Sequence, residues 1–141
     1  MAKKNITDIL TVAACALFGA LGAAQASGDH KHDHSEMDAK HGGVIFGIGD
    51  YDAELVVQHD EVELYLMDHD GNDVRGAVTG GEIVGISEGK SYKARLETRD
   101  GYLDGELDGE PSGKLKVVVR LKTVSGKTIV GKVDVRADTH N

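Results

Sequence analysis

The chain has 141 residues, a net charge of −8 with histidine neutral, no tryptophan and one cysteine. Its length suits a single domain behind a targeting segment. Its acidic balance argues against binding to nucleic acid or to anionic lipid, since both require a basic surface.

The first 26 residues have the pattern of an export signal. Lys3 and Lys4 precede an uncharged apolar run over residues 9–24. Ala24-Gln25-Ala26 then matches the small-x-small site of signal peptidase, which makes Ser27 the new N-terminus. Because the run is shorter than the roughly twenty apolar residues of a membrane span, we expect cleavage, a periplasmic location and no stable membrane insertion.

Cys15 offers an alternative, because Val12-Ala13-Ala14-Cys15 resembles a lipobox whose cysteine is lipidated. The sequence stays apolar after Cys15, whereas lipoproteins usually turn polar there, so signal cleavage is favoured. Removing 26 of the 141 residues, with Lys3, Lys4 and Asp8 among them, leaves 115 residues and a net charge of −9. The mature chain then has no thiol, which excludes disulfides, cysteine-ligated zinc and cysteine nucleophiles.

A histidine-rich segment follows the signal. Residues 27–43 are polar and lack apolar periodicity, so we expect them to be flexible. His30, His32 and His34 alternate with single residues, so an extended chain projects all three to one side. Imidazoles with carboxylates between them are ligands for late first-row metals. A merely polar linker is the plain alternative, and an N-terminus at Gly28 would instead form a square-planar Cu(II) or Ni(II) chelate through His30.

From residue 44 the pattern changes to short alternating apolar segments separated by Gly and Asp. This period-two alternation predicts an all-β domain over residues 44–137, followed by a C-terminal tail at 138–141. We expect an antiparallel β-sandwich of seven or eight strands, immunoglobulin-like in class. The strands expected from the alternation are 51–57, 61–67, 90–96, 114–123 and 128–135.

Glycine-containing pairs lie between the apolar runs and predict turns. These positions are Gly49-Asp50, Asp70-Gly71, Gly80-Gly81, Asp100-Gly101, Gly113 and Ser125-Gly126. The run 104–110 is expected to be a solvated turn. Residues 68–73 are acidic enough to suggest calcium, but their spacing does not match an EF-hand loop, so we expect a turn there as well.

A tight hairpin at Gly49-Asp50 fixes the pairing of the strands beside it. Ile48 then faces Tyr51, and paired residue numbers sum to 99, which places His41 opposite Gln58 and next to His59. We therefore predict that His41 and His59 lie at the end of the sheet where the histidine-rich segment enters. His69 is about 33 Å from His59 along an extended strand and cannot share its site. Two ordinary surface histidines remain the alternative.

The predicted metal ligands are thus His30, His32, His34, His41 and His59. Imidazole and carboxylate donors favour a divalent transition metal such as Cu(II), Zn(II), Ni(II) or Co(II). Binding should weaken as the pH falls through about 6.5, the ordinary histidine value. The sequence therefore predicts an exported metal-binding protein that sequesters, senses or delivers metal in homeostasis or resistance.

Two other classes of function were weighed. An enzyme is not expected, because no serine lies in a Gly-x-Ser-x-Gly elbow and no histidine is placed beside a candidate nucleophile. A protein-interaction module of the cell envelope with no metal role is the alternative, since small β-domains commonly serve as binding modules.

Three short motifs carry a resemblance to a known group. His41-Gly-Gly-Val44, Ala53-Glu-Leu-Val56 and Leu64-Tyr-Leu-Met-Asp-His-Asp-Gly71 resemble small exported proteins associated with bacterial heavy-metal efflux. A similar pattern occurs near the start of some periplasmic adaptor subunits of RND-type cation pumps. The resemblance spans about residues 40–74 and implies a stand-alone periplasmic, metal-responsive module, whose matching positions are His41, Glu54 and His69. Nothing in the chain resembles the adaptor's helical hairpin or lipoyl domains.

Overall fold

The computed structural model describes residues 37–137. The expected signal peptide, His30, His32, His34 and the C-terminal tail lie outside the described residues. Within 37–137 every regular element is a strand, and no helix long and apolar enough to cross a membrane is found there. The strands are β1 (Val44–Ile48), β2 (Tyr51–Gln58), β3 (Glu61–Met67), β4 (Val78–Ser87), β5 (Lys90–Thr98), β6 (Leu103–Glu106), β7 (Gly113–Thr123) and β8 (Thr128–Ala137).

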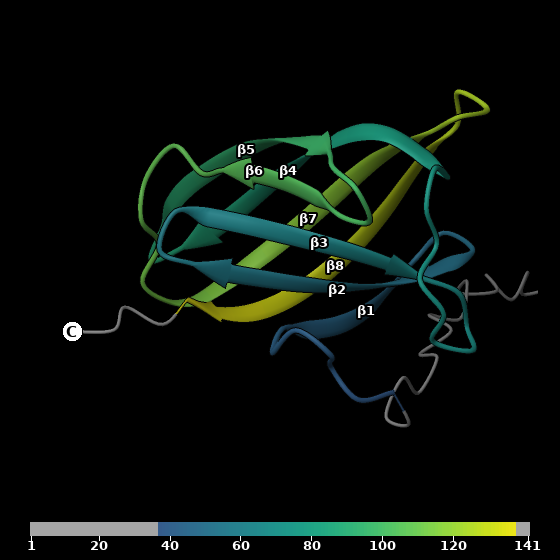
Figure 1. The fold of residues 1–141 in the computed structure, drawn as a ribbon. Coiled ribbons are helices and arrows are strands. Elements are labelled where there is room, and N and C mark those ends of the chain that lie inside the picture. Colours follow the sequence, from purple (N-terminus) through teal and green to yellow (C-terminus); the bar gives the residue numbers. More distant parts are fainter. Residues whose placement is uncertain (1–36, 138–141) are drawn as a thin grey trace, which may run out of the picture. The chain divides into compact units, whose positions relative to one another are not determined.

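The eight strands form one closed antiparallel barrel (Figure 1). Their order around the barrel is β1-β2-β3-β6-β5-β4-β7-β8, and Ile48 of β1 pairs with Gly131 of β8 to close the sheet. The expectation of an all-β antiparallel domain is therefore confirmed. The expected sandwich is corrected, because the strands close into a barrel instead of forming two separate sheets.

The short strand β6 is the reason for the difference. It pairs with β3 through Leu64↔Leu103 and with β5 through Thr98↔Leu103, and so it joins the two halves of the sheet. The sequence pattern predicted a solvated turn at residues 104–110; without β6, the strands β3 and β5 would be the two unpaired edges of an open sheet. The expected segments at 51–57, 61–67, 90–96, 114–123 and 128–135 all lie within observed strands.

Glycines inside the strands let the barrel interior pack. A Cβ at Gly81 would lie 2.7 Å from the Leu121 side chain and 2.3 Å from the Arg120 carbonyl oxygen. A Cβ at Gly131 would lie 2.6 Å from the Phe46 ring. Small residues beside large ones fill the narrow interior of a small barrel. The turn expected at Gly80-Gly81 is therefore wrong, since both residues belong to β4.

Candidate functional site

Two acidic side chains are buried on the outer surface of the barrel. Ala53 and Leu55 of β2 point into the core, so the alternate residues Asp52 and Glu54 point outward. Asp52 is only 1% exposed and Glu54 is 0% exposed. Buried carboxylates require hydrogen-bond partners, so this part of the surface must supply them.

The Glu54 carboxylate binds the backbone that precedes β1. Its Oε1 accepts hydrogen bonds from the N–H groups of His41 and Gly43, each at 2.8 Å, and its Oε2 accepts one from Lys40 at 2.9 Å. Gly42 adopts a φ of +79°, and a Cβ on Gly43 would lie 2.4 Å from the Leu55 carbonyl oxygen. The two glycines therefore allow the chain to reverse and to lie across the outer face of β2.

This reversal places the His41 ring on an aromatic pair. The ring stacks on Tyr65 with centroids 3.6 Å apart and planes 7° apart, and Tyr65 in turn stacks on Tyr102 at 5.4 Å. The Tyr65 hydroxyl donates a hydrogen bond of 2.8 Å to Glu63. Burial and the hydrogen bond to the Glu63 carboxylate raise the pKa of Tyr65 to about 12.

The predicted neighbourhood of His41 and His59 stays a prediction: Gly42 and Gly43, next to His41, line one pocket together with His59, but His41 itself does not extend the ladder. The pairing sum of 99 is confirmed for Val44–Ile48, but the ladder ends at Val44↔Leu55. His41 therefore does not continue the strand to a position opposite Gln58, because its N–H binds Glu54 and its ring covers Tyr65. His59 lies in the β2–β3 turn with a φ of +58°.

The segment before β1 leads instead toward the turn at residues 68–73. Lys40 Nζ donates a hydrogen bond of 2.6 Å to the Gly71 carbonyl and lies 3.8 Å from the Asp73 carboxylate. The Met37 sulfur lies 3.7 Å from the position that a Cβ on Gly71 would occupy. The histidine-rich segment thus joins the described chain beside His69, and not at the end of the sheet that carries His59.

His69 is held by the second buried acid. Its Nδ1 lies 2.8 Å from Asp52 Oδ2, and the imidazole side chain is 67% exposed. When the Asp52 carboxylate is the acceptor of this hydrogen bond, His69 Nδ1 is the donor, and in the neutral imidazole Nε2 then carries the lone pair. Imidazoles that bind metals are commonly oriented by a carboxylate in this way. His69 lies outside the ligand set predicted from the sequence, and its contact with Asp52 becomes visible only in the folded structure.

The turn that carries His69 is closed by its own side chains, as expected. The Asp68 carboxylate accepts hydrogen bonds from Asn72 Nδ2 at 3.0 Å, from Asn72 N at 2.9 Å and from Asp70 N at 3.0 Å. The bond from the Asn72 side chain is the largest cause of a lowered Asp68 pKa. The Asp68 carboxylate thus hydrogen-bonds within its own turn. These bonds fix the backbone conformation of the turn that carries His69.

The described residues do not complete a metal site by themselves. Among residues 37–137, no group of three or more His, Cys, Asp or Glu side chains is arranged to hold an ion. Comparisons of the chain with protein-family models, with curated proteins and with solved structures find no match.

Proposed function

We propose that this chain is an exported protein that binds a divalent transition metal ion, with His69 as the ligand that the barrel holds in place. The observation that carries the proposal is the 2.8 Å contact between His69 Nδ1 and the buried Asp52 carboxylate. This contact orients the exposed imidazole ring, so that the lone pair of Nε2 can bind a metal ion from a defined direction. A ligand already oriented before binding loses less conformational freedom when the ion arrives.

Histidines before the barrel are proposed to supply the other ligands. His34 lies six residues before Lys40, whose backbone is fixed on Glu54. A six-residue segment spans at most about 20 Å, so His30, His32 and His34 are candidates that the chain length allows. His41 is a further candidate, because Glu54, which anchors it, and Asp52, which anchors His69, are about 7 Å apart on one strand.

The proposed ligand set differs from the sequence prediction at one position. His69 takes the place of His59, because the chain enters the barrel beside the turn of residues 68–73. Imidazole donors favour Cu(II), Zn(II), Ni(II) or Co(II). The export signal pattern and the resemblance to efflux-associated proteins support a periplasmic role in sequestering, sensing or delivering metal, with an envelope efflux component as partner. The proposal concerns binding and assigns no reaction.

Isothermal titration of the chain from Ser27 onward with each of the four metal ions tests this assignment. His69→Ala is expected to weaken binding by about tenfold or more, and Asp52→Asn by about 10- to 100-fold, because the imidazole loses its orientation. His59→Ala is the matched control and is expected to leave affinity unchanged. Equal affinity for the chain and for a synthetic peptide of residues 27–40 would show that the barrel contributes no ligand, and the proposal would be wrong.

An envelope interaction module without a metal role is the second candidate function. The uneven distribution of acidic and basic residues over the strands of the barrel favours it, independently of metal binding.

A further inference from the structure

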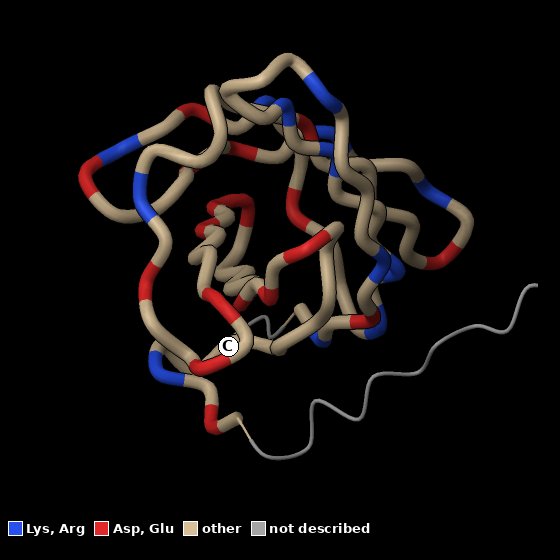
Figure 2. The backbone as a smooth tube through the Cα atoms, turned by 90° about the vertical axis from the view of Figure 1, so that its right-hand side faces the viewer, with Lys and Arg blue, Asp and Glu red and all other residues tan. Residues whose placement is uncertain are grey.

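Basic side chains gather on one part of the barrel wall, although the chain as a whole is acidic. The strands β7 and β8 carry six lysine and arginine residues and a single acidic residue, Asp134, all at exposed positions. Figure 2 colours the basic residues blue and the acidic residues red along the backbone. We call this surface the basic face. Its basic residues are Lys114, Lys116, Arg120, Lys122, Lys132 and Arg136.

The strands β3 and β6 show the opposite composition. They carry Glu61, Glu63, Asp104 and Glu106 and no lysine or arginine, and we call this surface the acidic face. Glu61 pairs directly with Glu106, and Glu63 pairs directly with Asp104. Like charges opposite one another on neighbouring strands are destabilising, and within the barrel they are relieved only in part: Arg99 pairs with Asp104 at 2.9 Å, and Arg95 and Arg99 line a pocket beside these acids.

The two faces lie on opposite sides of the molecule. In the closed order of eight strands, β3 is four strands from β7, and β6 is four strands from β8. A barrel of this order therefore carries opposite charge on opposing walls. The segregation is invisible in the net charge of −8.

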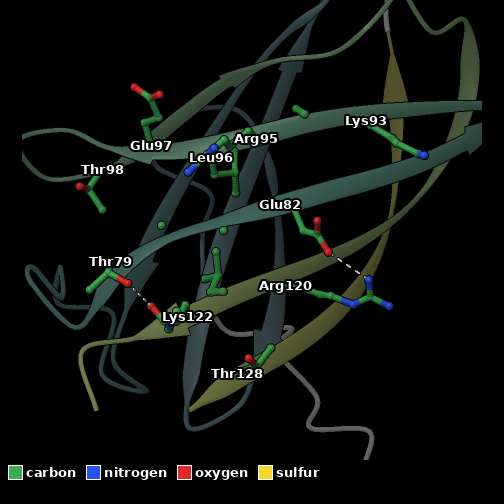
Figure 3. A pocket seen from close by; sticks show the side chains of 14 residues that line it. Thr79, Glu82, Lys93, Arg95, Leu96, Glu97, Thr98, Arg120, Lys122 and Thr128 are labelled. Atoms are coloured by element: carbon green, nitrogen blue, oxygen red, sulfur yellow. Dashed lines mark hydrogen bonds and ion pairs between the residues drawn. The ribbon is translucent and has the colours of Figure 1, made fainter. Parts of the chain in front are cut away.

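Internal ion pairs neutralise the basic face only in part. Lys114 pairs with Asp134 at 2.7 Å, and Arg120 pairs with Glu82 of β4 at 3.0 Å (Figure 3). Among the described residues, no ion pair is recorded for the remaining basic residues of the face. Figure 3 shows that Lys93, Arg95 and Lys122 also border the groove over β4, β5 and β7.

Apolar side chains accompany the charges on both faces. Val130 of β8 is 49% exposed beside the basic residues, and Ile86 of the adjoining β4 is 54% exposed. On the acidic face, the half-buried rings of Tyr65 and Tyr102 are stacked on one another. Each face thus combines a predominant sign of charge with apolar surface, a composition that suits contact with a protein.

We propose that the acidic face of one copy of this chain binds the basic face of a second copy. The two faces are complementary in charge, and contact would place opposite charges against the like-charge pairs on β3 and β6. At an ionic strength of about 0.1 M the screening length is about 10 Å, so charges in direct contact still attract while repulsion between whole molecules is weakened. Because two different faces meet, the association is head to tail. Such contacts form a closed ring if the rotation between copies closes, and an open chain of copies if it does not.

Sedimentation velocity of the purified protein over a concentration series, at about 0.1 M and about 1 M salt, tests this proposal. We expect association at the lower salt concentration and mainly monomer at the higher one. The double variant Lys122→Glu with Lys132→Glu should weaken association by about tenfold or more. A double variant with the same charge change at the ends of two hairpins, Lys90→Glu with Lys127→Glu, is the matched control and should associate like the parent protein.

A charge exchange between the faces gives a second readout. Glu61→Lys with Glu106→Lys should also prevent self-association, whereas its mixture with Lys122→Glu/Lys132→Glu should form mixed complexes, because opposite charges face one another again. Circular dichroism of each variant verifies that the barrel is folded. The proposal would be overturned if the parent protein stayed monomeric at every concentration. It would also be overturned if Lys122→Glu/Lys132→Glu associated as strongly as the control Lys90→Glu/Lys127→Glu.

Discussion

Glu54 holds His41 at the surface of the barrel through the backbone and not through the imidazole. The buried carboxylate accepts the His41 N–H at 2.8 Å, together with the N–H groups of Lys40 and Gly43, while the His41 ring turns outward onto Tyr65. One side chain thus directs the histidine-rich segment across β2. This contact makes the position of the segment testable by substitution of residues that are not themselves proposed metal ligands.

Replacing Glu54 with alanine should destabilise the fold. The substitution removes a fully buried acceptor and leaves three backbone N–H groups without it, for which we expect a loss of about 3 kcal/mol in the free energy of unfolding. Urea denaturation measures this loss. Glu61→Ala on the exposed face of β3 is the control and should change stability by about 0.5 kcal/mol or less. Equal effects of the two substitutions would contradict the role given to Glu54.

Gly43→Ala should displace the segment that Glu54 binds. Its Cβ would lie 2.4 Å from the Leu55 carbonyl oxygen, so the chain must shift, at an expected cost of about 1–3 kcal/mol. Gly42→Ala is the matched comparison, because its Cβ has open space around it and only its φ of +79° is unfavourable. We expect Gly43→Ala to be the more destabilising and to shift the ring resonances of Tyr65 in NMR spectra as His41 moves away.

Tyr65 should ionise at unusually high pH. Burial first, and then the hydrogen bond to Glu63, raise its pKa to about 12. Because the folded-state pKa lies above the unfolded value near 10, the protonated phenol contributes stability below about pH 10. That contribution is lost as the pH rises through about 12.

Ultraviolet absorbance of the phenolate monitors this titration. Glu63→Gln should lower the Tyr65 pKa toward its ordinary value, because the charged acceptor is removed. Glu61→Gln, on the same strand without a hydrogen bond to Tyr65, is the control. A Tyr65 pKa that is the same in Glu63→Gln as in the parent protein would show that the hydrogen bond has no influence.

Asn72→Ala should raise the pKa of Asp68. The Asn72 side chain supplies the largest contribution to the lowered value, and its removal leaves two backbone donors on the carboxylate. A carboxyl group with a lowered folded-state pKa stabilises the fold above its unfolded pKa and loses that contribution as the pH falls through the folded value. Carboxyl ¹³C chemical shifts report the Asp68 titration directly, and an identical curve for Asn72→Ala and the parent protein would argue against this cause.

Local pattern alone predicted much of the secondary structure. Period-two alternation located β2, β3, β5, β7 and β8, and the Gly49-Asp50 turn predicted the pairing of β1 with β2 residue by residue. These features depend on neighbours in the chain: side chains alternate along any strand, and a two-residue turn fixes the register of the strands beside it. The turn at residues 68–73 was predictable for the same reason, since Asp68 hydrogen-bonds to groups two and four residues ahead.

The arrangement of the site was decided by contacts between distant segments. Asp52 and Glu54 occupy outward strand positions, where acidic residues are ordinary, and only the segment folded back over β2 makes them buried partners. The same holds for His69, whose neighbour Asp52 is seventeen residues away. Closure of the barrel depended on the four-residue strand β6, and the opposition of acidic and basic faces depended on the strand order. Composition and alternation are properties of the linear chain, whereas burial and opposition arise only when its separate strands are packed around one core.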